Sequence, residues 1–131
     1  MSEAPEWVDE HGRIVFDVFA QACASRATLE HITGRWGTLA MVALHDCTLR
    51  FNALRRRVSG VSEKMLAQTL RTLEADGLVH RDARPVVPPH VEYSLTDRGA
   101  GLAERMVPLM AWIADHAPDI VSDAEAAAVR R

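Results

Sequence analysis

One stretch in the middle of the chain constrains the fold most, because two short helical patterns flank a tight turn within it. Apolar side chains recur at helical spacing in residues 50–58 and again in residues 62–76. Gly60 readily supplies the positive φ that a turn between them needs. Ser62 is a favourable N-cap for the second helix, and Gly77 ends it. Two helices joined by a short turn containing glycine are the outline of a helix-turn-helix.

A β-hairpin is expected directly after the second helix. Residues 78–82 and 91–96 are typical of strands, and the second alternates, with Val91, Tyr93 and Leu95 on one face. The proline-rich loop between these strands cannot continue a sheet. A hairpin in this position is a wing. The sequence therefore predicts a mainly α fold with a small β-hairpin, a winged helix-turn-helix.

Further helical patterns flank this unit on both sides. Residues 14–22 carry apolar side chains on one helical face, residues 27–45 predict a second helix, and Thr96 caps a last helix with a broad apolar stripe. The terminal helices offer more apolar face than one small core should use. We therefore expect N- and C-terminal dimerisation helices that pair across a two-fold axis. The predicted dimerisation residues are Ile14, Val18, Phe19, Leu102, Met106, Leu109, Met110 and Ile113.

A chain of 131 residues fits one domain. We expect a flexible lead-in over residues 1–12, a single winged helix-turn-helix domain with its flanking helices over 13–116, and a frayed tail over 117–131. The longest apolar runs are too short to span a bilayer, and the N-terminus lacks the plan of a secretory signal. The sequence therefore predicts a cytoplasmic protein with no membrane partner.

The net charge of −3 conceals a basic segment. Residues 50–84 hold eight Lys or Arg against four acids, a balance of +4, while residues 1–49 hold three against seven and residues 85–131 hold four against seven. A phosphate backbone responds to local positive charge, so the middle third is suited to bind double-stranded DNA.

The second helix of the helix-turn-helix is expected to enter the major groove with its outward side chains. Gln68 has the geometry to pair with adenine, and Lys64 or Arg71 to reach guanine. The predicted base-reading residues are Glu63, Lys64, Ala67, Gln68 and Arg71. The predicted contacts to the DNA backbone are Arg55, Arg56, Arg57 and Ser62. The predicted wing contacts are His80, Arg81 and Arg84.

Six segments now stand in order along the chain: Cys23, Gly34-Arg35-Trp36, Arg50-Phe51-Asn52-Ala53-Leu54, Gly60-Val61-Ser62-Glu63-Lys64-Met65-Leu66, Leu73-Glu74-Ala75-Asp76-Gly77-Leu78-Val79 and Val91-Glu92-Tyr93-Ser94-Leu95-Thr96-Asp97-Arg98-Gly99. In order and spacing they resemble the HxlR-type regulators over residues 20–115. The resemblance implies a dimeric winged-helix regulator on a pseudo-palindromic operator. It also implies a sensing cysteine near Cys23, although Ala24 stands where the family usually has Pro and Arg35 where it usually has Lys.

The residues themselves leave two interpretations of Cys23 open. It is either a small buried hydrophobe or a sensor of oxidants or electrophiles, with Arg26 close enough to favour the thiolate. Cys47 is expected to be structural. The histidines lack metal-ligand spacing, so we predict no metal and no cofactor.

The function predicted from these features is sequence-specific transcriptional regulation by a homodimer, with repression, activation and the identity of an oxidant or small-molecule effector left open. The alternative is a winged-helix module that binds a protein instead of DNA, which Lys64, Gln68 and Arg71 argue against. An enzyme built on Cys23 with His31 as base is a further rival. No oxyanion loop or glycine-rich phosphate cradle accompanies that pair, so we predict no catalytic site.

Overall fold

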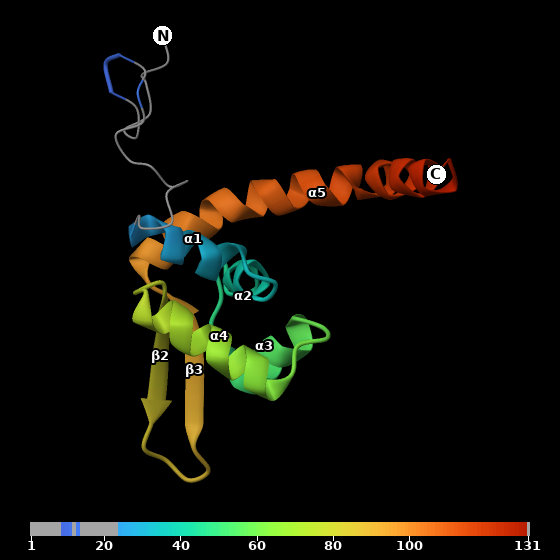
Figure 1. Cartoon of the computed structure of the whole chain (residues 1–131). Helices are drawn as coiled ribbons and strands as arrows, with labels where there is room; N and C mark the ends of the chain where they lie inside the picture. The colour runs from blue at the N-terminus through green and yellow to red at the C-terminus, as the bar shows by residue number, and fades with distance from the viewer. Residues whose placement is uncertain (1–8, 12, 14–23, 131) are drawn as a thin grey trace.

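Helices form most of the computed structural model, which describes residues 9–11, 13 and 24–130 (Figure 1). Within these residues the order of elements is α1 (Ala24–Thr33), α2 (Gly37–Ala43), β1 (Leu49–Arg50), α3 (Phe51–Arg57), α4 (Glu63–Ala75), β2 (Val79–Arg84), β3 (His90–Leu95) and α5 (Asp97–Val129). This order confirms the predicted winged helix-turn-helix, with α3 and α4 as its two helices and β2 and β3 as its wing.

The sheet has three antiparallel strands in the order β1-β3-β2, one more than the predicted hairpin. The short strand β1 joins the edge of β3, where Leu49 lies opposite Tyr93. Val91, Tyr93 and Leu95 all pack on the core, as their alternation predicts. The tip of the hairpin projects away from the helices, and α5 lies at the opposite end of the molecule (Figure 1).

The core lies among α2, the helix-turn-helix, the sheet and the first part of α5. Leu66, Leu70 and Leu73 of α4 are almost completely buried, together with Leu54 of α3 and Met41 of α2. Burial of each large aliphatic side chain stabilises the fold by about 1.5–3 kcal/mol. The core therefore holds α4 by one face and leaves its opposite face in solvent.

The single helix predicted over residues 27–45 is wrong, because the structure divides it into α1 and α2. The chain turns at residues 34–36, and the start of α2 comes back against the end of α1. A Cβ atom on Gly37 would lie only 2.1 Å from the His31 carbonyl oxygen, so this close approach requires glycine. The Thr38 hydroxyl donates to the Ile32 carbonyl and closes the turn.

The frayed tail predicted over residues 117–131 is also wrong, because α5 continues as far as Val129. Alanine, the strongest helix former, recurs along residues 117–128 and explains why the helix continues. The predicted lead-in over 1–12 and the helix predicted over 14–22 lie almost wholly outside the described residues.

Candidate nucleic-acid interface

Helix α4 is defined at both ends by the residues that the sequence singled out. The Ser62 Oγ accepts a hydrogen bond from the Met65 amide at 3.1 Å, which satisfies one of the free amides of the first turn. Gly60 and Gly77 adopt the left-handed φ values of 93° and 74° that the turn and the helix end require. These details confirm the predicted cap and turn chemistry.

The side chains predicted to read bases lie on the face of α4 opposite its buried leucines. Lys64, Gln68 and Arg71 are exposed, and Ala67 is half-buried. Glu63 is exposed as well, but its carboxylate lies 3.3 Å from Arg55 Nη1. This ion pair joins the start of α4 to α3, so Glu63 has a partner within the chain that its predicted role did not include.

The arginine run at the end of α3 divides into one engaged and two free side chains. Besides the Glu63 pair, Arg55 Nε donates to the Val61 carbonyl at 3.4 Å, which ties it to the turn. Arg56 and Arg57 are exposed, and no other described residue holds either of them. The hydroxyl proton of Ser62 is not used by its cap bond and can still be donated outward.

The register of the wing separates the three cations predicted there. His80 and Arg84 share the outer face of β2, whereas Arg81 lies opposite Tyr93 on the face that turns toward the core. Arg81 lines one hollow together with Ala67 and Arg71 of α4. The structure thus brings Arg81 to the recognition helix and leaves His80 and Arg84 on the far side of the sheet.

Acids neutralise much of the positive charge on that outer face. Asp82 and Glu92 lie directly opposite each other, and Arg84 lies 3.6 Å from Asp82 and 3.5 Å from Glu92. His90 Nε2 is 2.7 Å from Glu92 Oε1, and its Nδ1 faces the guanidinium of Arg50. The hydrogen bond from His90, helped by the charge of Arg84, holds the pKa of Glu92 below its ordinary value.

We name this set the wing network: Arg50, Asp82, Arg84, His90 and Glu92. Sequence reasoning missed it, although one signal was present. Residues 90 and 92 are two positions apart on one strand and therefore lie on the same face, and the same holds for residues 82 and 84. Which of these faces meet depends on the register between the strands.

The predicted dimerisation residues of α5 are only partly available to a partner. Met106 is 6% exposed and belongs to the core of its own chain, so its assignment to a dimer interface is wrong. Leu102 is half-buried against the same core, and Met110 is half-buried. Leu109 and Ile113 are exposed.

The apolar surface of α5 also extends beyond the predicted set. Ile120 and Val121 are exposed in the segment expected to fray, and so is Trp112, whose ring stacks on His116 at a centroid distance of 4.1 Å. The predicted residues Ile14, Val18, Phe19 and Cys23 lie outside the described residues. Cys47, which was expected to be structural, is exposed, and its Sγ donates to the Ala43 carbonyl within its own chain.

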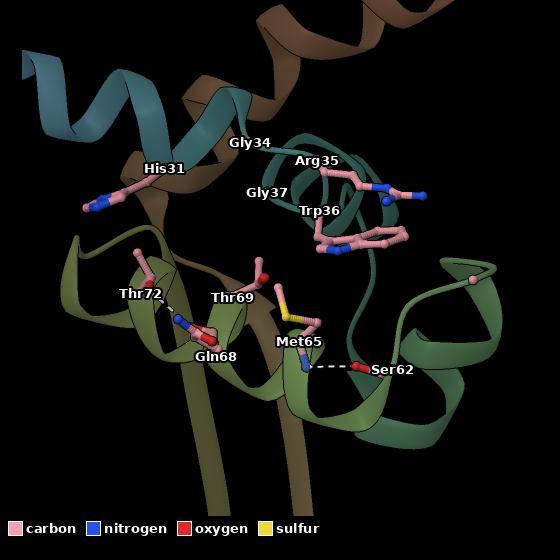
Figure 2. Close-up of a pocket in the computed structure, with 11 residues that line it drawn as sticks. His31, Gly34, Arg35, Trp36, Gly37, Ser62, Met65, Gln68, Thr69 and Thr72 are labelled. Carbon is pink, nitrogen blue, oxygen red and sulfur yellow. Dashed lines mark hydrogen bonds between the residues drawn. The ribbon is translucent and has the colours of Figure 1, made fainter.

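Arg35, like Arg81, is a cation beside α4, but it was not among the predicted DNA contacts. Arg35 is exposed in the turn between α1 and α2, and its Cζ lies 4.7 Å from the ring centroid of Trp36. Both residues line a groove that continues along α4 past Ser62, Met65 and Gln68 (Figure 2). The sequence showed the motif Gly34-Arg35-Trp36 but not its position next to α4.

Among the described helices, none combines the length and the apolar character needed to cross a bilayer.

Comparison with known proteins agrees with this geometry. The family described as HxlR-like helix-turn-helix matches residues 31–120. The HTH-type transcriptional regulator YtfH of Escherichia coli is 52% identical over 106 residues, which cover 81% of this chain and 84% of that protein. The solved structure of the transcriptional regulator ytfH from Salmonella typhimurium superposes with a TM-score of 0.79 at 50% identity, covering 83% of this chain and 97% of the other. The reduced form of the redox regulator HypR superposes with a TM-score of 0.68 at 37% identity, covering 74% and 96%.

Proposed function

This chain belongs to the HxlR-like helix-turn-helix family, and from that premise we propose that it binds a pseudo-palindromic DNA operator sequence-specifically as a homodimer. The members of the family are transcriptional regulators and not enzymes. One observation carries the proposal: α4 is capped, held by its buried leucines, and presents Lys64, Gln68 and Arg71 to solvent beside the helix-turn-helix turn.

The proposed base contacts follow from hydrogen-bonding geometry in the major groove. Gln68 pairs with the N6 and N7 atoms of adenine, while Lys64 and Arg71 donate to guanine O6 or N7. Ala67, which is half-buried, offers a small apolar contact of the kind that suits a thymine methyl group. Glu63 acts mainly through its ion pair with Arg55, which fixes the start of α4.

The proposed backbone contacts surround the same helix. Arg56 and Arg57 are free to meet phosphates, and Arg55 and Ser62 lie at the turn between α3 and α4. Phosphate contacts of this kind position a protein on the duplex but carry no sequence information. In the wing, Arg81 is suited to contact DNA next to α4, whereas Arg84 is shared between two acids.

The homodimer is supported by the exposed apolar stripe of α5. Leu109 and Ile113 lie one helical turn apart on its surface and are 54% and 43% exposed. Covering them with a second copy would remove this apolar surface from water and relate two α4 helices by a two-fold axis. Two recognition helices spaced about one DNA turn apart, roughly 34–36 Å, match a pseudo-palindromic site.

The decisive experiment is a gel-shift titration on DNA from upstream of the protein's own gene, with excess random competitor. We expect a competitor-resistant complex that contains two protomers per site, as measured by the mass of the complex. If a selection of binding sites from the whole genome yields only complexes that random competitor DNA removes, the protein-interaction module is favoured instead.

A response to oxidants is a second candidate, favoured by the similarity to the redox regulator HypR. A thiol oxidant added to the same titration tests it. We expect oxidation to change operator binding in the wild type and in Cys47→Ser but not in Cys23→Ser. An unchanged gel shift in the oxidised wild type would leave Cys23 as a packing residue.

A further inference from the structure

We propose that Arg35, stacked on the ring of Trp36, is a DNA-backbone contact on the flank of α4 opposite Arg55 and Arg56. The inference rests on the proposed function. It adds a contact outside the helix-turn-helix, from the turn between α1 and α2.

The ring of Trp36 connects this turn to the helix-turn-helix. Trp36 is half-buried and packs against the hydrophobic core. A Cβ atom built on Gly60 would lie 3.8 Å from Trp36 Cη2, so the ring reaches the turn that precedes α4. The Arg35 guanidinium lies over this ring, at 4.7 Å from its centroid. Stacking on a fixed aromatic face holds a flexible cation in place.

The turn before α4 separates two hollows that each contain arginine. Gly60 and Ser62 border both of them. One hollow is lined by Arg55 and Arg56 of α3, and the other by Arg35. The N-terminal part of α4 therefore has a cation on each flank, as Figure 2 shows for Arg35 and Trp36 above Met65 and Ser62.

This arrangement matches the shape of B-DNA. The major groove is about 12 Å wide and is edged by phosphates of both strands. A helix that enters the groove therefore has a phosphate row on each side. Arg55 and Arg56 are placed for one row, and Arg35 is placed for the other.

Arg35 is also the available cation of its groove. The other basic side chain there, His31, is engaged, because its Nδ1 lies 2.6 Å from Asp76 Oδ2. Arg35 is exposed and stacks on the Trp36 ring, and it forms no hydrogen bond or ion pair with another described residue. No described residue therefore neutralises its charge.

The openness of the groove favours DNA over a small ligand. A typical small-molecule site buries most of its ligand among enclosing side chains. Here the larger part of the lining is exposed, including Arg35, Met65 and Gln68. Gln68 is in addition one of the proposed base-reading residues, so the groove opens onto the same surface that meets the bases.

The test compares the salt dependence of DNA affinity between variants of the full-length protein. Fluorescence anisotropy titrations on an operator duplex and a random duplex are made at several salt concentrations. Arg35→Ala is expected to weaken both complexes by about 2- to 5-fold, as one exposed charged contact should. The negative slope of log K against log salt should also become shallower by about 0.9, because one phosphate contact is lost.

Two further variants separate charge from fold. Arg35→Lys keeps the charge and is expected to restore the slope. Arg105→Ala, which removes an exposed arginine from α5, should change neither affinity nor slope. Thermal unfolding of each variant should stay cooperative and close to the wild type, since Arg35 and Arg105 are exposed and Arg35→Ala gives up only its stacking on Trp36.

A wild type that binds DNA with the same slope as Arg35→Ala overturns the assignment of Arg35 and leaves the proposed function intact. If the salt slope of Arg35→Lys is as shallow as that of Arg35→Ala, the assignment of Arg35 is overturned too. A wild type that binds neither duplex overturns the proposed function itself.

Discussion

Helix α4 and the β2–β3 wing carry similar basic side chains but differ in how much of that charge is free. On α4, Lys64 and Arg71 are exposed, and no other described residue neutralises them. On the outer face of the wing, Arg84 is shared between Asp82 and Glu92. The comparison teaches that the number of cations in a segment does not measure the charge that it offers to DNA.

The same distinction revises the meaning of the basic segment over residues 50–84. Its excess of +4 is real, but the acids that compensate it are not spread evenly. Glu63 engages Arg55, and the wing network engages Arg84 and Arg50. Among the described residues the free positive charge of this segment therefore lies on α4, at the end of α3, where Arg56 and Arg57 lie, and at Arg81 beside α4. We expect these elements to carry the electrostatic part of binding.

The largest effects should come from the base-reading side chains of α4. Gln68→Ala or Arg71→Ala should each cost about 1–3 kcal/mol on the operator, roughly 5- to 150-fold in affinity, and far less on random DNA. His80→Ala, an exposed position on the outer face of the wing, is the matched control and should lose little specificity. Competitive gel shifts on both duplexes measure the ratio.

Equal losses on operator and random DNA for Gln68→Ala and Arg71→Ala would contradict their assignment as base readers. A loss of specificity in His80→Ala as large as that in Gln68→Ala or Arg71→Ala would contradict the contrast between α4 and the wing. It would mean that the outer face of the wing reads bases despite its internal ion pairs.

A smaller effect should separate Arg56 of α3 from Arg84 of the wing. Arg56→Ala removes a free cation, so affinity should fall similarly on all DNA sequences. The negative slope of log K against log salt should become shallower by about 0.9. Arg84→Ala removes a cation whose charge two acids already offset, and its slope should change much less. Anisotropy titrations over a range of salt concentrations measure both. Equal changes in slope would show that the ion pairs of Arg84 open on DNA.

Local signals in the sequence predicted the helix-turn-helix well, and the reason is physical. The Ser62 cap, the left-handed glycines at 60 and 77 and the leucine spacing of α4 all act over a few residues. Each therefore predicts the same element independently of the rest of the fold. The alternation on β3 is local in the same sense, and it placed Tyr93 in the core correctly.

Features that depend on contacts between distant segments were missed. The break between α1 and α2 depends on the approach of Gly37 to the His31 carbonyl, which helical spacing does not reveal. The burial of Met106 depends on how α5 packs on the core. The wing network joins residues 50, 82 and 92 through the strand register, and no short motif contains all three.

The smallest effect should come from weakening the wing network at Glu92. Glu92→Gln removes a carboxylate that accepts from His90 and lies near Arg84, so it should lower the melting temperature slightly at neutral pH. Because the pKa of Glu92 is lowered from 4.5 in the fold, this stabilisation is present above about pH 4.5 and is lost as the pH falls through the lowered pKa. The gap in melting temperature between wild type and Glu92→Gln should therefore close in acid.

Glu104→Gln, an exposed position on α5, is the control and should show no such pH dependence. A gap that stays constant across the acid range would mean that the fold does not depend on the Glu92 charge, and the contrast between a self-paired wing and a free α4 would lose its energetic support.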